Sequence, residues 1–298
     1  MKWVEFSVQT PSEFVEPISE IFHRYGQGGV AIDAPGGFNP DEGEQPLPNP
    51  LVTVRAYAPV DQRLNDRRSR IQVGVMLVSQ LAPVSPLKER EMEEEEWQDA
   101  WKKHFHVLHV GRRIVIVPTW RQHKPGKSEV VIRLDPGMAF GTGHHPTTRM
   151  CLEALEQLVR PGMAVLDVGC GSAILSVAAA RLGAARVLGL EIEPVAAQTG
   201  LRNAALNEAS ETVTVLEGSL PNPAAAPAFY DIVAANISAK VIIGLADEMA
   251  AVAKPGGMLL ASGILTERMD EVRGRLDAAG FEIENVQVDG DWVALTAR

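Results

Sequence analysis

Cysteine is almost absent from this chain, which has only Cys151 and Cys170 among its 298 residues. Two cysteines are too few for the disulfide framework of a small secreted domain, so we expect a reducing compartment, the cytoplasm. Long apolar stretches are lacking too, since no run approaches the roughly 18 residues that a membrane-spanning helix requires. Residues 1 to 6 are typical of a strand rather than a signal peptide.

Positive charge is also in short supply. Lysine and arginine together number 28 against 38 aspartates and glutamates, which gives a net charge of -10 at pH 7. This deficit argues against tight binding to naked nucleic acid and is compatible with a basic protein partner. Apolar residues make up 46% of the chain and charged residues 22%, the balance of a globular protein with a substantial core.

The first third of the chain alternates between strand and helix patterns. Residues 3–9 alternate apolar and polar side chains, and residues 11–25 carry apolar side chains at helical spacing. Further strands are expected at 30–33 and 51–58, a helix at 61–74 and a fourth strand between 76 and 92. This β-α-β-β-α-β order predicts a small α+β ferredoxin-like domain over residues 1–94.

Residues 95–129 are expected to connect two domains. Six glutamates lie between Glu89 and Glu96 and favour a solvated charge run, the alternative being an electrostatic funnel for a lysine-rich partner. Aromatic side chains follow at helical spacing and predict a packing face; they are Trp97, Trp101 and Phe105. We expect no metal at the nearby histidines, because no cysteine or carboxylate completes a ligand set; these are His104, His106 and His109.

A glycine turn is the strongest functional signal in the chain. A buried strand is expected at 164–168 and a helix at 172–182, with Gly169-Cys170-Gly171 between them. The two glycines lack a Cβ, so a ligand can approach their backbone closely. The following helix directs its free N–H groups at whatever lies over the turn. This is how a parallel α/β sheet binds nucleotide-like ligands.

The residues around the turn narrow the class of ligand. A dinucleotide fingerprint would have a small residue where Ile174 stands, and the Gly-Lys-Ser/Thr ending of a phosphate-binding loop is missing. Asp167 would repel a pyrophosphate but suit an ammonium, and Glu191 follows the next strand, where a carboxylate can accept both ribose hydroxyls. These features fit S-adenosylmethionine. The alternative is a plain βαβ turn that binds nothing.

A long glycine-rich loop precedes the turn. Residues 135–148 are polar, and the glycines between Phe140 and Gly143 let the backbone lie against a flat ligand. Thr148 offers a hydroxyl from the first turn of a helix expected at 147–159. His144 and His145 suggest catalysis, but we expect each to cap or pack.

Strands and helices alternate from residue 130 to the C-terminus. After the glycine turn, strands are expected at 186–190, 212–216, 230–235, 257–262, 281–288 and 291–296, and helices at 194–207, 238–253 and 266–279. The last two strands form an antiparallel hairpin beside a parallel sheet. A seven-stranded, Rossmann-like α/β domain with one reversed strand, characteristic of class I methyltransferases, is therefore predicted for residues 130–298.

Several motifs together resemble the bacterial ribosomal protein L11 methyltransferase family. They are Leu134-Asp-Pro-Gly-Met-Ala-Phe-Gly-Thr-Gly with His145-Pro-Thr-Thr148, Asp167-Val-Gly-Cys-Gly-Ser-x-Ile-Leu-Ser176 and Ala234-Ala-Asn-Ile237. The resemblance implies that S-adenosylmethionine is bound at Thr148, Gly169, Glu191 and Asn236. The neighbouring residues complete the expected set of cofactor contacts: Phe140, Gly141, Thr142, Gly143, Asp167, Cys170, Gly171 and Ile192. It also implies that the N-terminal domain holds the substrate protein and moves relative to the catalytic domain.

The chain departs from the family pattern at three places. His144 replaces the usual Thr, Ala173 replaces a Gly, and Glu191 stands where the family has Asp. We expect Ala173 to cost little at a helix start, and Glu191 still to bind the ribose diol.

The expected reaction transfers a methyl group to a lysine ε-amine, or to an N-terminal α-amine, of ribosomal protein L11. The amine must be neutral, and Asn236 at the end of a strand is well placed to orient it; the alternative is that Asn236 only stabilises its turn. Two other functions stay open. One is the same chemistry on another protein, as in electron-transfer-flavoprotein lysine methyltransferases, and the other is a non-catalytic S-adenosylmethionine-binding factor. We expect a monomer.

Overall fold

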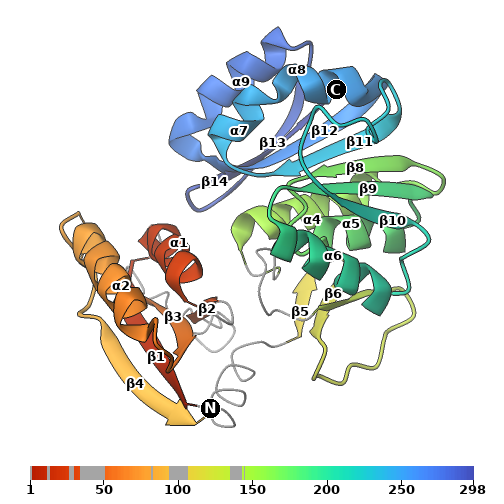
Figure 1. The fold of residues 1–298 in the computed structure, drawn as a ribbon. Coiled ribbons are helices and arrows are strands. Elements are labelled where there is room, and N and C mark those ends of the chain that lie inside the picture. Colours follow the sequence, from red (N-terminus) through yellow and green to blue (C-terminus); the bar gives the residue numbers. More distant parts are fainter. Residues whose placement is uncertain are drawn as a thin grey trace, which may run out of the picture. The chain divides into compact units, whose positions relative to one another are not determined.

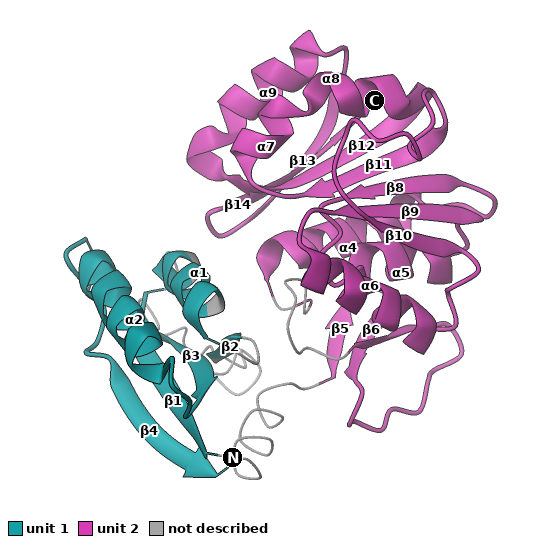
Figure 2. Ribbon diagram, in the orientation of Figure 1, with its two compact units in different colours: residues 1–105 teal, residues 106–298 magenta. Residues whose placement is uncertain are grey.

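The computed structural model describes residues 2–11, 14–26, 30–33, 51–81, 83–93, 107–134, 143 and 145–298. The chain divides into two compact units, residues 1–105 and 106–298 (Figure 2). The residues predicted as an aromatic stripe and two of the three histidines beside it lie outside the described residues. No helix in the described ranges has both the length and the apolar character to span a membrane.

The first unit has the predicted β-α-β-β-α-β order. Its elements are β1 (Lys2–Thr10), α1 (Val15–Tyr25), β2 (Val30–Asp33), β3 (Val52–Pro59), α2 (Leu64–Ser79) and β4 (Lys88–Glu93). The sheet order is β2-β3-β1-β4, with antiparallel neighbours. Alternate β1 side chains such as Phe6 pack against Ile18, Phe22 and Ile71 from the two helices, so the strand alternation seen in the sequence reflects one covered face.

Helix α2 is longer than predicted. The expected stop at Gly74 is wrong, because the helix continues to Ser79. A Cβ on Gly74 would lie 2.8 Å from Ile21 Cγ2 of α1, so this glycine allows two helices to pack closely and does not end one. In the predicted acidic run, Glu89 forms a 2.8 Å ion pair with Arg68 of α2, while residues 94–96 lie outside the described residues.

The second unit contains the predicted seven-stranded sheet (Figure 1). Its order is β10-β9-β8-β11-β12-β14-β13, parallel except where β14 pairs antiparallel with β12 and β13. The strands are β8 (Ala164–Val168), β9 (Arg186–Glu191), β10 (Val213–Glu217), β11 (Tyr230–Asn236), β12 (Ala253–Leu265), β13 (Ile283–Asp289) and β14 (Trp292–Ala297).

Helices cover both faces of this sheet (Figure 1). One face carries α4 (Pro146–Leu158), α5 (Ile174–Arg181) and α6 (Pro194–Leu206); the other carries α7 (Ala239–Gly244), α8 (Ala246–Val252) and α9 (Met269–Ala278), the last preceded by a short 3-10 turn at Thr266–Arg268. Buried clusters lie on each face. The core strand β8 is buried along its whole length, which explains its unbroken apolar run apart from Asp167.

Two sequence predictions for this unit are corrected. The helix expected at 238–253 is two short helices, and the strand expected at 257–262 is longer, because β12 starts at Ala253 beside Tyr230, runs to Leu265 and is bulged. Part of the predicted connection belongs to the second unit: β5 (Leu108–Val110) and β6 (Ile114–Pro118) form a three-stranded sheet with β7 (Val130–Leu134). Every residue of β6 is buried, so this strand requires a covered position that a linker would not provide.

Candidate functional site

The glycine turn lies between β8 and α5 and has a backbone geometry that favours glycine. Gly169 and Gly171 have positive φ angles of 70° and 53°. A Cβ on Gly169 would lie 2.3 Å from Ile237 Cγ2. The amides of Gly169 and Cys170 both donate to the Leu190 carbonyl of β9, at 2.8 and 3.0 Å. These bonds hold the turn against the neighbouring strand, and its two glycines have no side chains of their own.

Glu191 ends β9 beside this turn, and its carboxylate is held by two backbone amides. Its Oε2 accepts from the Gly171 N–H at 2.8 Å and its Oε1 accepts from the Glu193 N–H at 3.0 Å. A carboxylate offers about four acceptor positions, so two remain for hydroxyl groups of a ligand. The sequence did not predict the bond between this side chain and the Gly171 amide.

Asp167 lies one strand away, in the middle of the sheet, and is buried with 1% of its surface exposed. The Ser176 hydroxyl of α5 donates to its Oδ2 at 2.6 Å, whereas Oδ1 is buried and has no hydrogen-bond partner in the described part of the chain. Burial raises the pKa of this carboxyl to about 6. A buried acceptor without a donor costs about 1–3 kcal/mol, so this oxygen fits a cationic donor from a ligand.

Two further predicted residues meet at the same edge of the sheet. Thr148 is fully buried in the first turn of α4, and Asn236 ends β11. The Asn236 Nδ2 donates to Thr148 Oγ1 at 3.3 Å, which leaves the amide oxygen for another partner.

These groups lie along the carboxyl ends of β8, β9 and β11, where open α/β sheets bind ligands. A family model for ribosomal protein L11 methyltransferase (PrmA) matches residues 2–298. The chain belongs to this family. A ribosomal protein L11 methyltransferase of Chloroflexus aurantiacus is 42% identical over 99% of this chain and 98% of its own length. One from Geobacillus kaustophilus is 41% identical, covering 100% and 99% of the two chains.

A solved structure of a related protein has a similar fold. The ribosomal protein L11 methylase of Lactobacillus delbrueckii subsp. bulgaricus is 31% identical, with a TM-score of 0.61 over 65% of this chain and 98% of its own. Members of the family take their methyl group from S-adenosylmethionine. The unpartnered Asp167 oxygen, the bare turn and the fixed Glu191 carboxylate fit the ammonium, backbone approach and ribose that this cofactor presents.

His145 has the capping role that the sequence predicted. It precedes α4, and its Nδ1 accepts from the Thr147 N–H at 3.4 Å and contacts the Thr147 hydroxyl at 2.7 Å. Its ring packs edge-to-face on Trp292 at 4.9 Å. Burial, with a smaller effect of Arg149, lowers its pKa to about 4, so the ring is neutral at pH 7. His144 lies outside the described residues.

The remaining predicted contacts divide into three groups. Gly143 is buried with a φ of 86°, and a Cβ there would lie 2.2 Å from Ile116 Cδ1. Cys170 is buried in the turn, and burial raises the pKa of its thiol, while Ile192 is 71% exposed beside Glu191. The other three lie outside the described residues: Phe140, Gly141 and Thr142.

The structure corrects the expectation made for Ala173. Ala173 is not a low-cost substitution, because its φ of 60° is left-handed, where a Cβ is unfavourable by about 1–2 kcal/mol. Its Cβ faces Gly200 of α6.

His109, which was predicted not to bind metal, lies beside His123. The Glu129 carboxylate is hydrogen-bonded to His123 at 2.7 Å. Among the described residues, no group of three such side chains is arranged to hold a metal ion.

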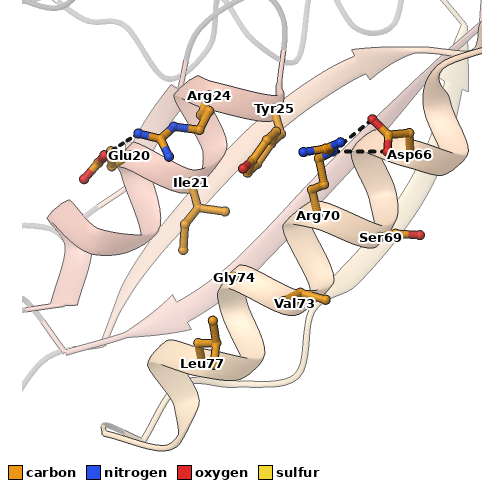
Figure 3. Close-up of a pocket in the computed structure, with 10 residues that line it drawn as sticks. All are labelled: Glu20, Ile21, Arg24, Tyr25, Asp66, Ser69, Arg70, Val73, Gly74 and Leu77. Carbon is orange, nitrogen blue, oxygen red and sulfur yellow. Dashed lines mark hydrogen bonds and ion pairs between the residues drawn. The ribbon is translucent and has the colours of Figure 1, made fainter.

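The first unit carries a groove of about 500 Å³ between α1 and α2 (Figure 3). Its lining residues are Glu20, Ile21, Arg24, Tyr25, Asp66, Ser69, Arg70, Val73, Gly74 and Leu77. Val73 and Leu77 are 51% and 56% exposed and lie one helical turn apart. Two ion pairs also line the groove near these apolar side chains, Arg24–Glu20 and Arg70–Asp66. The groove thus combines exposed apolar area with paired charges.

Proposed function

We propose that this protein transfers methyl groups from S-adenosylmethionine to lysine ε-amines, and to the N-terminal α-amine, of ribosomal protein L11. The observation that supports this best is the buried Oδ1 of Asp167, which has no partner among the described residues, lies beside the glycine turn and so calls for a positively charged ligand group. Membership of the L11 methyltransferase family supports the substrate.

The cofactor is held by residues that end neighbouring strands. Glu191 binds the ribose hydroxyls, pre-oriented by the Gly171 and Glu193 amides. Asp167 accepts from the ammonium, and the backbone of Gly169 lies against the amino-acid portion. The exposed Ile192 side chain offers apolar surface to the flat base. The bound cofactor supplies a methyl group already activated on a sulfonium.

Asn236 orients the acceptor amine. Its Nδ2 is engaged by Thr148, and its Oδ1, which has no hydrogen bond to a described residue, accepts an N–H from the amine and so directs the lone pair at the methyl carbon. A lysine has an ordinary pKa of about 10.4 and reacts only when neutral. Burial near the sulfonium lowers that pKa, and water takes the released proton. Positioning supplies most of the rate because the donor is activated.

The first unit binds the substrate protein, and the groove between α1 and α2 is the surface that contacts it. Contiguous exposed apolar side chains mark interaction sites, and the groove lies on the unit that carries no part of the described cofactor site. The protein acts as a monomer in the cytoplasm on a protein substrate, without binding nucleic acid.

Intact mass spectrometry of purified ribosomal protein L11, before and after incubation with enzyme and S-adenosylmethionine, tests the proposal. We expect additions in steps of one methyl group. Transfer of labelled methyl in a cell lysate separates the alternatives. Label on a protein of another size favours a different substrate such as electron-transfer flavoprotein, and no label despite cofactor binding favours a non-catalytic factor.

A further inference from the structure

Among the described residues, Ser176 supplies the side-chain hydrogen bond to Asp167. It is the third residue of α5, the helix that follows the glycine turn, and is completely buried. Its hydroxyl donates to Asp167 Oδ2 at 2.6 Å, the short distance typical of a bond to a charged acceptor. Its neighbours Val177 and Ala178 contribute only apolar atoms to the core.

The environment of Asp167 explains why such a donor matters. Burial opposes ionisation of its carboxyl, and Glu191 on β9 adds a second negative charge. Two thiols also lie near it, on α4 and in the turn, and burial keeps both neutral; they are Cys151 and Cys170. The Ser176 hydroxyl is thus the side-chain donor that opposes these effects. By engaging Oδ2 it also fixes the rotation of the carboxylate, in which Oδ1 has no hydrogen-bond partner among the described residues.

We propose that Ser176 is a positioning residue for the cofactor's ammonium group: its hydroxyl holds the Asp167 carboxylate ionised and turned so that Oδ1 receives the ammonium. This inference rests on the placement of the cofactor proposed above. The competing interpretation is that Ser176 only fills space between α5 and the sheet.

Two ligands that differ only at the amino-acid end separate these interpretations. S-adenosylhomocysteine carries the ammonium, and 5′-methylthioadenosine lacks the whole amino-acid portion. Calorimetry of Ser176→Ala should show about tenfold weaker binding of the first ligand, consistent with loss of a bond that supports a charge-assisted contact. Binding of the second should change less than about twofold and reports that the variant is folded.

The pH dependence provides a readout that loss of packing would not change. In the wild type, binding of S-adenosylhomocysteine should weaken as the pH falls through about 6, because Asp167 becomes protonated. In Ser176→Ala the weakening should begin at a higher pH, since the hydroxyl no longer favours the charged form. Binding of 5′-methylthioadenosine should follow neither change.

Controls separate failure of this inference from failure of the proposed function. Ser262→Ala removes an equally buried hydroxyl, which donates to the Val293 carbonyl, and should leave the ratio of the two affinities unchanged. An unchanged ratio and pH profile in Ser176→Ala would overturn the role of Ser176 alone. A wild type that binds S-adenosylhomocysteine no better than 5′-methylthioadenosine, or binds neither, would overturn the cofactor placement itself.

Discussion

Asn236 and Thr148 come from a strand end and a helix start 88 positions apart, and a 3.3 Å hydrogen bond from Asn236 Nδ2 to Thr148 Oγ1 joins them. This bond uses the nitrogen end of the amide, so the oxygen end is available to a substrate. A side chain that could have rotated freely is thereby given one orientation. The pair connects the helix that follows the glycine-rich loop to the edge of the sheet where methyl transfer is proposed.

Removing the amide should affect turnover more than cofactor affinity. We expect Asn236→Ala to lower kcat by about 100-fold, the order found when a group that positions a proton is lost. Thr148→Val keeps the volume but frees the amide to rotate, so kcat should fall by about tenfold. Labelled-methyl transfer to ribosomal protein L11 measures both. The control Asn222→Ala alters an amide whose oxygen accepts from the Ala224 N–H in a loop, and should retain wild-type turnover. Full activity of Asn236→Ala would remove Asn236 from the reaction.

Local patterns in the sequence were sufficient to predict most of the secondary elements and the edge of the sheet where the proposed cofactor contacts lie. The apolar run at 164–168 and the glycines after it locate the turn, because a strand buried on both faces and a positive φ each demand particular residue types. Glu191 could be placed because carboxyl ends of parallel strands share one edge of a sheet. The helix before β12 splits after Gly244, the last residue of α7, and a single glycine inside a helical pattern is too weak a signal to predict that break.

Contacts between distant segments account for the rest. Nothing near Ser176 in the sequence shows that its hydroxyl meets Asp167, because this depends on the rotation of α5 over β8. The left-handed φ of Ala173 was missed for a related reason: the residue type does not specify the backbone angle, and only the turn geometry reveals the strain. Gly74 looked like a helix end because its true role, close packing on Ile21, involves another helix.

Ala173 and Gly200 should be energetically coupled. A Cβ on Gly200 would lie 3.1 Å from Ala173 Cβ and 3.3 Å from the Gly171 carbonyl oxygen. Gly200→Ala should therefore fail to gain the roughly 1 kcal/mol that alanine brings to a helix interior. In the Ala173→Gly background the closest contact is gone and the gain should appear, with a coupling free energy of about 1 kcal/mol in urea unfolding. Gly274→Ala on α9, where a Cβ meets nothing within 4 Å, should stabilise both backgrounds equally. Simple additivity of the Ala173 and Gly200 changes would contradict this packing.

Asp167 should lower the free energy of unfolding of the cofactor-free protein at neutral pH. Its pKa is about 6 in the folded chain against an ordinary value of 3.8, so the stability associated with it is fully present below pH 3.8 and is lost as the pH rises through 6. At about 1.4 kcal/mol for each pH unit between these values, Asp167→Asn should stabilise the cofactor-free protein by up to about 3 kcal/mol near pH 7.5, and by roughly half that near pH 5. Urea unfolding at the two pH values measures the difference.

Asp231→Asn is the matched control for this pH effect. Burial opposes ionisation of Asp231, but its bonds to Lys254 Nζ and the Ala164 N–H, both 2.7 Å, outweigh burial and lower its pKa. Its stability contribution has the opposite sign, present at neutral pH and lost as the pH falls, so this variant should be destabilised near pH 7.5. If Asp167→Asn also lost stability there, the carboxyl would not be the strained group that its burial indicates.

Charge introduced into the groove of the first unit should impair docking of the substrate and nothing else. Val73→Glu and Leu77→Glu place carboxylates on exposed positions of α2, where glutamate is a good helix former, so folding should be preserved. We expect KM for ribosomal protein L11 to rise by about tenfold or more, as when an apolar contact residue of an interface is lost, with unchanged affinity for S-adenosylhomocysteine. Val60→Glu changes an exposed apolar residue of the same unit that does not line the groove, and should leave KM unchanged. If the groove variants and Val60→Glu gave the same KM as the wild type, the substrate would dock on another surface, and the exposed apolar side chains of α2 would need a different explanation.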